Sequence, residues 1–255
     1  MSAMGDIRIE TAERVMTITL DRAAKKNAIT DAMYGEIAAA LDRAAGDPAI
    51  GAVLVRGEGA DFCAGNDISM FAASAAGEAD IATSNVGPFL RALSTCPKPI
   101  VAAVTGRAIG VGVTMLLHCD LVYVAADAQL STPFIDLGLV PEAASALLIP
   151  ARIGHARSFA LFALGEKLSG AEAATLGIAN RALSAEDVGT AASAAARALA
   201  AKPLSAVVAT KKLMRDAGAI EAALAADRDA FIRQLATPEA AAAFAAFAAR
   251  KGPPA

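Results

Sequence analysis

Three short apolar segments separated by helical stretches constrain the fold of this chain more than any other feature. They are Ala52–Val55, Ile100–Val104 and Leu121–Val124, and they end at Gly, Thr-Gly and Ala-Asp signals. Continuous apolar runs of this length are typical of strands buried on both faces, and the helices between them supply the crossovers that parallel strands need. With 255 residues and 56% hydrophobic side chains, the chain can bury a large core. The pattern predicts an α/β fold built on a parallel sheet.

The two ends of the chain are expected to differ in structure. Ile7–Glu10 and Val15–Leu20 alternate with period two and predict a hairpin, and a helix is expected from about Thr30 to Ala45. After Pro150 the strand signal nearly disappears, apart from Ala179–Leu183. We predict a core over residues 1–200 and a helical region over residues 201–255 that contributes to a subunit interface.

Helix starts in the last third are explicit. Ser169 with Glu172 is a capping box, and Thr237-Pro238 places an N-cap before a proline. The alanine-rich stretches there carry apolar faces, so they are expected to be packed helices.

Composition excludes several classes of partner. The net charge is −3 without a basic stripe, so nucleic acid is not expected. Cys63, Cys96 and Cys119 are mutually distant and lack a CxxC or histidine-rich neighbourhood, so neither disulfides nor a metal site is indicated. The longest apolar run, Ala108–Leu117, is too short to span a bilayer, and the first residues lack a secretory pattern. We expect a soluble cytoplasmic protein that does not engage a membrane.

Two glycine-rich segments are suited to bind an oxyanion. Gly57–Asp67 and Gly106–Gly112 each follow a predicted strand and have small residues where backbone would approach a ligand. The N–H of Ala64 and the N–H of Val111 are the candidate donors, the latter at the start of a predicted helix. The alternative is that each segment is only a tight connection between a strand and a helix.

Glu142 is the strongest candidate base. It follows Pro141 at the mouth of a predicted helix, and a carboxylate facing the two loops would form a proton-transfer site. The alternative is an acid that merely complements the helix dipole. The helix end would favour the ionised form and burial the neutral form, and the sequence leaves that balance open. Asp136 is a competing base, although it suits a turn or cap equally well.

Three further residues invite a functional interpretation. His118 and His155 lack a carboxylate, serine or cysteine partner nearby in sequence, which favours structural roles. Cys63 has no placed histidine and is expected to be a small packing residue rather than a nucleophile.

Taken together, Cys63–Ile68, Ala103–Gly110 and Cys119–Leu121 resemble the crotonase (enoyl-CoA hydratase/isomerase) superfamily. The resemblance covers nearly the whole chain and implies a spiral of ββα units with a C-terminal helical trimerisation region. It further implies homotrimers or dimers of trimers, and an acyl-CoA thioester whose carbonyl lies between the N–H groups of Ala64 and Val111. CoA would then be part of the substrate, and no separate cofactor is expected.

The chain departs from the hydratases of this superfamily at both of their acids, because Thr114 and Phe134 stand at the matching positions. Neither side chain can activate water, so efficient hydration is not expected. The chain looks closest to the 3-enoyl-CoA to 2-enoyl-CoA isomerases, in which one glutamate, matching Glu142, is the catalytic base. Rivals are another crotonase-type acyl-CoA activity, including hydration, and a non-catalytic acyl-CoA-binding protein.

The resemblance also implies contacts with CoA. The segment before the first long helix meets the nucleotide end of CoA in this family, and the first glycine-rich loop lines the adenine pocket. The implied contacts are Lys25, Lys26, Asn27, Ala28, Gly65, Asn66, Asp67, Ile68 and Gly110, and Lys251 could reach a phosphate from a neighbouring subunit.

Overall fold

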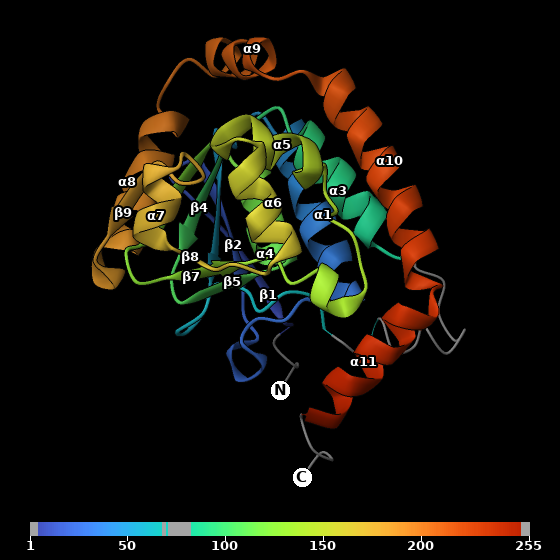
Figure 1. Cartoon of the computed structure of the whole chain (residues 1–255). Helices are drawn as coiled ribbons and strands as arrows, with labels where there is room; N and C mark the ends of the chain where they lie inside the picture. Colours follow the sequence, from blue (N-terminus) through green and yellow to red (C-terminus); the bar gives the residue numbers. More distant parts are fainter. Residues whose placement is uncertain (1–4, 68–69, 71–82, 251–255) are drawn as a thin grey trace.

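The computed structural model describes residues 5–67, 70 and 83–250, and its centre is a six-stranded sheet (Figure 1). The strand order is β1-β2-β3-β4-β6-β9. β1 and β2 pair antiparallel and the other neighbours pair parallel. The strands are β1 (Ile7–Ala12), β2 (Val15–Leu20), β3 (Ala52–Gly57), β4 (Ile100–Val104), β6 (Leu121–Ala125) and β9 (Arg181–Leu183). The predicted hairpin and the three predicted parallel strands are confirmed.

A second sheet of three short strands lies beside the first. It contains β5 (Arg107–Ile109), β7 (Gln129–Ser131) and β8 (Leu168–Ser169), in that order. β5 occupies part of the glycine-rich segment that we expected to be a loop, because Arg107–Ile109 pairs in parallel with β7. These strands are too short to give a periodic sequence signal, and their pairing partners are supplied only by the fold.

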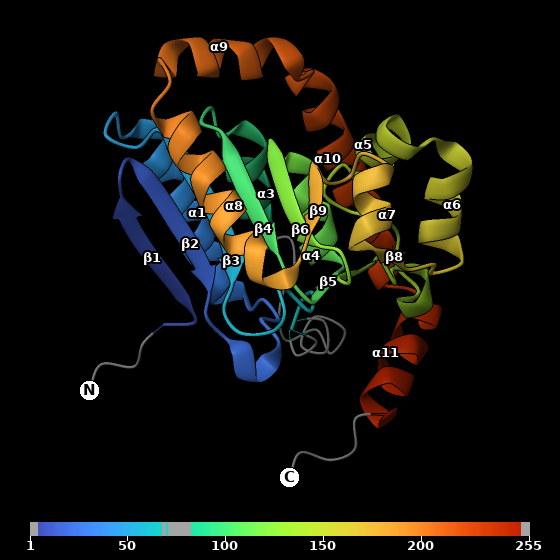
Figure 2. The same ribbon diagram turned by 90° about the vertical axis from the view of Figure 1, so that its left-hand side faces the viewer.

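Helices cover both faces of the large sheet. α8 (Ala185–Ala200) packs on β3, β4 and β6, whereas α1 (Asp31–Gly46) packs on β1, β2 and β3 and against α3 (Val86–Thr95) (Figure 2). The predicted first helix is confirmed, since Thr30 caps α1 by accepting from the Met33 N–H. Tyr34 and Leu41 are among the buried residues of α1, and the Tyr34 ring lies 4.9 Å from that of Phe89 in α3.

Shorter helical segments connect the strands. α4 (Val111–Thr114) leads directly into the 3-10 helix η3 (Met115–His118), and the capping box of Ser169 and Glu172 begins α7 as predicted. The remaining connecting segments are η1 (Ala23–Lys25), η4 (Ile135–Leu137), α5 (Ser145–Ile153), α6 (His155–Ala163) and α7 (Gly170–Thr175).

Three helices end the chain and wrap around the core. α9 (Leu204–Met214) crosses above the sheet, α10 (Ala217–Leu235) runs alongside α3, and α11 (Pro238–Arg250) projects away from the body (Figures 1 and 2). Lys211 anchors α9, because its Nζ donates to Asp120 Oδ2 at 2.7 Å and to the Lys98 carbonyl at 2.8 Å. The division of the chain at residue 200 into a core and an oligomerisation region remains a prediction.

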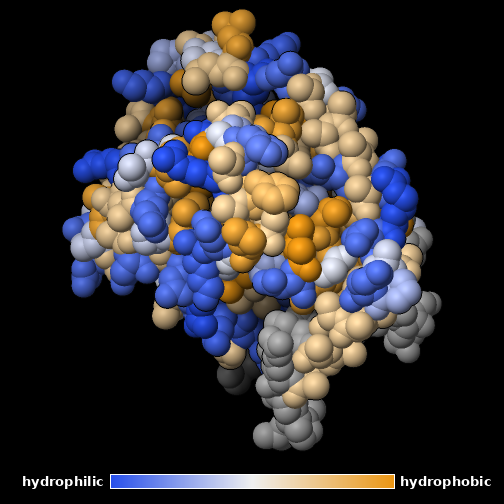
Figure 3. Space-filling view, viewed as in Figure 1, coloured by the Kyte–Doolittle hydropathy of each residue, from blue (hydrophilic) through white to orange (hydrophobic). Residues whose placement is uncertain are grey.

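Several large apolar side chains remain exposed on this chain. Hydrophobic residues gather on the face that carries α5 and α6 (Figure 3). Within the residues that the structure describes, no helix is long and apolar enough to cross a bilayer. The exposed large apolar residues are Ile135, Leu147, Phe159, Leu164, Leu213 and Met214.

Candidate active site

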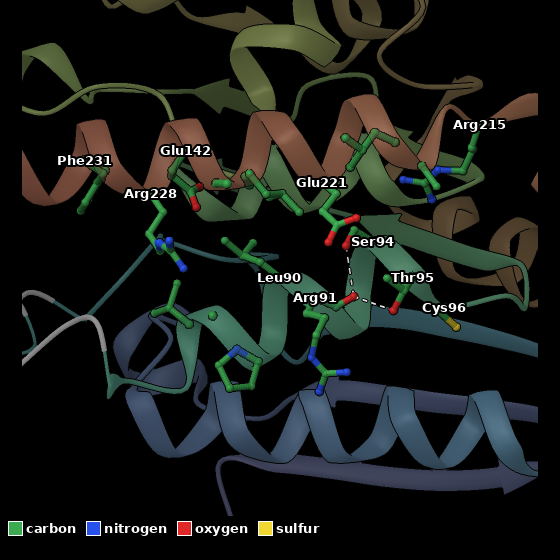
Figure 4. A pocket seen from close by; sticks show the side chains of 18 of the residues that line it. Leu90, Arg91, Ser94, Thr95, Cys96, Glu142, Arg215, Glu221, Arg228 and Phe231 are labelled. Atoms are coloured by element: carbon green, nitrogen blue, oxygen red, sulfur yellow. Dashed lines mark hydrogen bonds between the residues drawn. The ribbon is translucent and has the colours of Figure 1, made fainter.

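A cavity of about 970 Å³ lies between α3 and α10, and it contains Asn66 and Glu142 in its wall (Figure 4). Most of its lining is apolar, as in ordinary small-molecule sites. The apolar lining includes Val86, Leu90, Ile220, Leu224 and Phe231, and the charged lining includes Arg91, Lys212, Glu221 and Arg228.

Glu142 lies in a turn, not in the first turn of a helix as the sequence pattern predicted. α5 begins only at Ser145, because Ala143 and Ala144 both adopt left-handed backbone conformations with φ of 59° and 57°. Non-glycine residues adopt this conformation at a cost, so the surroundings must hold the turn in place. The helix dipole therefore does not account for an acid at this position.

Burial decides the ionisation of Glu142. Removal from water raises the pKa of this carboxyl to about 7; the hydroxyl of Thr114 opposes the rise and the charge of Asp227 adds to it. Thr114 Oγ1 donates to Glu142 Oε1 at 2.5 Å. A carboxyl with a pKa near neutrality can both accept and return a proton, which is what acid–base catalysis requires.

The two glycine-rich segments meet beside this carboxyl. A Cβ on Gly112 would stand 2.8 Å from the Cys63 carbonyl oxygen, and one on Gly65 would stand 3.1 Å from that of Ile109. Only glycine allows the backbones to approach this closely. Within the described part of the chain, the N–H of Val111 has no acceptor. Val111 begins the same short helix, α4, from which the side chain of Thr114 contacts Glu142.

The prediction that the Ala64 N–H is free is wrong. This N–H donates to the Lys26 carbonyl at 2.9 Å, since the turn before α1 folds against the loop. Two residues further on, the N–H of Asn66 has no acceptor among the described residues, and Asn66 lines the cavity with Glu142. Gly65, with φ of 92°, reverses the backbone between the two amides. The pair of available amides is therefore Asn66 and Val111.

The predicted CoA contacts divide into exposed and structural residues. Lys25 and Lys26 are exposed at the end of η1, whereas Asn27 is buried and its side chain binds the carbonyls of Glu58 and Asp61. The amide of Asn27 therefore holds the loops together and is not free for a ligand.

Arg22 binds two further residues of the predicted CoA site, Ala28 and Asp67. Its guanidinium donates to the Ala28 carbonyl at 3.0 Å and to Asp67 Oδ2 at 2.6 Å. Gly110 donates its N–H to the Ser131 carbonyl at 2.8 Å. Ile68 and Lys251 lie outside the described residues, and a contact of any of these residues with CoA remains a prediction.

The alternative candidates lie elsewhere or lack the required chemistry. Asp136 is exposed in η4 and does not line the cavity, and His155 is exposed on α6. Burial raises the pKa of the Cys63 thiol to about 12, so it is not a ready nucleophile. Phe134, at one of the two hydratase positions, is buried against Phe162, with ring centroids 6.2 Å apart.

Sequence reasoning missed Asp227, whose charge acts on Glu142. A signal for it was present, because Asp227 lies three residues after Leu224 and four before Phe231, two apolar residues of α10 that line the cavity. A charged residue on an apolar helix stripe is unusual. Sequence reasoning also considered Thr114 only as the residue that replaces a hydratase acid, although its hydroxyl donates a hydrogen bond to Glu142.

Comparisons with known proteins agree with this fold. A model of the enoyl-CoA hydratase/isomerase family matches residues 10–254. A probable enoyl-CoA hydratase of Rhodobacter capsulatus is 35% identical over 206 residues, which are 81% of this chain and 79% of the relative. Enoyl-CoA delta isomerase 2 of Rattus norvegicus is 36% identical over 167 residues, 64% of this chain and 42% of the relative.

Among solved structures, OdaA of Pseudomonas aeruginosa superposes with a TM-score of 0.91 at 42% identity, covering 96% of this chain and 99% of that chain. The chain belongs to the enoyl-CoA hydratase/isomerase family and has the crotonase fold with a C-terminal helical region. It is accordingly an enzyme of a family that acts on acyl-CoA substrates.

Proposed function

We propose that the protein is a 3-enoyl-CoA to 2-enoyl-CoA isomerase in which Glu142 moves the proton. The observation that carries this proposal is the partly buried carboxyl of Glu142, whose pKa is raised to about 7 by removal from water, in the wall of a mostly apolar cavity. Free backbone N–H groups of Asn66 and Val111 on the two adjoining loops support it.

The reaction needs one carboxyl and one oxyanion site. Glu142 removes a proton from C2 of the 3-enoyl thioester, and the electron pair delocalises onto the thioester oxygen as a dienolate. The N–H groups of Asn66 and Val111 stabilise that negative charge; one such donor is typically worth about 3 to 4 kcal/mol of barrier. The protonated Glu142 then returns the proton at C4, which leaves a conjugated 2-enoyl thioester and regenerates the base.

The surroundings of Glu142 favour a proton shift over hydration. Thr114 contributes a hydroxyl that binds Glu142, and Phe134 is packed in the core. Neither supplies the second carboxyl that would hold and activate water for addition to the double bond.

The proposal is tested with purified protein and a 3-enoyl-CoA. The wild type should generate the ultraviolet absorbance of a conjugated 2-enoyl thioester, and Glu142→Gln should abolish it. Asp136→Asn is the matched control, because it neutralises the nearby exposed acid and should retain turnover. Unchanged turnover in Glu142→Gln would overturn the assignment.

Isotope transfer tests the one-base route separately. A substrate deuterated at C2 and turned over in ordinary water should carry part of its deuterium to C4, because the same carboxyl removes and returns it. Complete loss of deuterium at every turnover would contradict transfer by Glu142 alone.

The rival functions have distinct outcomes. Conversion of a 2-enoyl-CoA to a 3-hydroxyacyl-CoA would indicate hydration, and CoA binding by calorimetry without turnover would indicate a binding protein.

We further propose that the enzyme needs no separate cofactor, that Lys25 and Lys26 meet the nucleotide end of CoA, and that the chain assembles as trimers.

A further inference from the structure

His118, at the end of η3, is a buried side chain that the proposed reaction does not use. It is 0% exposed, and η3 continues α4 without a break, so that Val111, Thr114 and His118 belong to one helical segment. Thr114 binds the carboxyl of Glu142. His118 binds the backbone of the next residue, Ala143. One helical segment therefore contacts both the candidate base and the turn that follows it.

The contact of His118 with Ala143 is a hydrogen bond to the carbonyl oxygen. Nε2 of the ring lies 2.9 Å from this oxygen. Ala143 is 1% exposed, and within the described part of the chain its carbonyl has no other hydrogen-bond donor. Because a buried carbonyl without a donor is unfavourable, His118 supplies a bond that this turn needs.

Arg215, which follows α9, fixes the protonation of the ring. Its guanidinium donates to Nδ1 of His118 at 3.1 Å and to the carbonyl oxygen of the same residue at 3.3 Å. Arginine can only donate and a carbonyl can only accept, so Nδ1 is the acceptor and Nε2 carries the proton. The hydrogen bonds to Arg215 and to Ala143 therefore require the same neutral tautomer.

The turn after Glu142 has a backbone conformation that needs such support. Ala143 and Ala144 adopt left-handed φ of 59° and 57°, which alanine does not favour. His118 binds the peptide that follows Glu142, and it does so from the helical segment that begins with Val111. The segment thus fixes the base relative to the N–H group that we assign to the oxyanion site.

The surroundings of His118 keep the ring neutral at neutral pH. Removal from water lowers its pKa to about 4, and the hydrogen bond to the Ala143 carbonyl opposes this shift. The positive charges of Arg215, of Arg152 from α5 and of Lys211 from α9 lower the pKa further. A neutral ring retains the lone pair on Nδ1 that Arg215 binds.

We propose that His118, oriented by Arg215, is a positioning residue for Glu142. It holds the Ala143 carbonyl and thereby fixes the turn that carries the base. Arg215 and Glu142 both line the cavity but lie apart along it (Figure 4), so Arg215 acts on the base through His118. The inference rests on the proposed function and deepens it.

The state of the ring is tested without substrate. The chain has two histidines, so histidine-selective nitrogen-15 labelling of the ligand-free protein gives two imidazole groups, and His155→Gln identifies that of His118. NMR shifts at neutral pH should show a protonated Nε2 and an unprotonated Nδ1 in His118. A protonated Nδ1 would overturn the inference, because Arg215 and Ala143 could not then bind the ring together.

Two amide variants separate the hydrogen bond to Ala143 from the rest of the side chain. In His118→Gln the amide nitrogen can take the place of Nε2, whereas in His118→Asn it can replace only Nδ1. We expect kcat of His118→Asn to fall about tenfold to a hundredfold, because the base is displaced, and kcat of His118→Gln to stay within about threefold of the wild type. KM should change little in both variants, since His118 does not line the cavity.

His155→Gln is the matched control, because it makes the same substitution at an exposed histidine on α6 and should leave kcat unchanged. Thermal unfolding shows whether each variant folds. Equal kcat in His118→Gln and His118→Asn would overturn the inference, since a merely structural histidine would not distinguish them. If His118→Asn does not fold, His118→Gln decides alone, because a folded His118→Gln protein that loses kcat as strongly would also overturn it.

A double variant tests the part of Arg215. Arg215→Met keeps the length of the side chain and removes its donors, so kcat should fall about fivefold. Combined with His118→Asn, it should cause no further loss of kcat, because both substitutions act on the same turn. Additive losses would overturn the part that we assign to Arg215.

A partial reaction separates this inference from the proposed function. A saturated acyl-CoA has no double bond to move, yet a proton at C2 exchanges with deuterium in heavy water if Glu142 removes it and returns a deuteron. Exchange in the wild type that is lost in His118→Asn, without isomerisation of a 3-enoyl-CoA, would reject the proposed reaction and leave the role of His118 standing. Exchange at the wild-type rate in His118→Asn would overturn the inference.

Discussion

At the scale of single residues, Glu142 combines a partly buried position with a contact that stabilises its charge. Burial favours the protonated form, and the Thr114 hydroxyl favours the ionised form. The result is a pKa of about 7, where a carboxyl exchanges a proton readily at neutral pH. Two predictions follow from these opposing effects.

The first concerns stability. The folded pKa of Glu142 is raised from 4.5 to about 7, so its protonated form stabilises the folded state at low pH. This contribution is fully present below about pH 4.5 and is lost as the pH rises through 7. At pH 8, the free energy of unfolding of Glu142→Gln, measured with urea, should therefore exceed that of the wild type by up to about 3 kcal/mol. At pH 4.5 the two proteins should differ little.

Glu36→Gln, on the exposed side of α1, is the matched control and should change the free energy of unfolding little at either pH. A Glu142→Gln variant with equal stability to the wild type at pH 8 would contradict the burial of a charged Glu142.

The second concerns the pH dependence of activity. kcat/KM of the wild type should rise with pH through about 7, as Glu142 becomes deprotonated. Thr114→Val keeps the shape of the side chain and removes the donor that stabilises the carboxylate. Its acid limb should move to higher pH by about one unit, since a hydrogen bond to a charged group is worth about 1.5 to 3 kcal/mol. A limb that stays in place would show that Glu142 does not control it.

At the scale of elements, the C-terminal helices depend on a few buried polar contacts with the core. Lys211 joins α9 to Asp120, whose carboxylate also accepts the N–H of Ile100 in β4 at 2.8 Å. The alanine-rich helices α8 and α11 were readable from propensity and apolar spacing. Their docking sites were not, because docking depends on residues far away in sequence.

Removal of this anchor should loosen α9. Lys211→Ala leaves Asp120 without its cation, and we expect a loss of about 2 to 3 kcal/mol in the free energy of unfolding, less than for a fully buried pair because Asp120 is 26% exposed. Lys212→Ala removes the neighbouring exposed lysine and should cost less than about 0.5 kcal/mol. Equal losses in the two variants, measured by urea unfolding, would show that the ion pair is not the anchor.

At the scale of the whole molecule, exposed apolar side chains indicate surfaces that another chain could cover. Leu213 and Met214 at the end of α9 are 88% and 81% exposed, and Phe159 and Leu164 are also largely exposed. Patches of this kind are common at subunit contacts. The proposed trimer would bury such surface.

Light scattering tests this assembly. The 25.6 kDa chain should elute with three or six times that mass. A Leu213→Ser, Met214→Ser double variant should shift toward the monomer at low concentration, because it removes apolar surface that association would bury. Lys202→Ser, which changes an exposed polar position nearby, should not alter the mass. A monomeric wild type would reject the trimer.

The sequence by itself determined the parallel strands, the N-terminal hairpin, the helical C-terminal third and the family, because period and apolar run length are local properties. It also singled out Glu142 and Val111. It wrongly placed Glu142 in the first turn of a helix and wrongly left the Ala64 N–H free. The positive φ of Ala143 and Ala144 and the hydrogen bond from Ala64 to Lys26 depend on neighbours remote in sequence.

Only the tertiary structure decided how basic Glu142 is and what controls it. Its burial, the hydroxyl of Thr114 and the charge of Asp227 come from three elements that are far apart along the chain. Solvation and electrostatic interaction depend on distance in space, so a sequence can nominate the carboxyl while its pKa and its positioning are set by the fold.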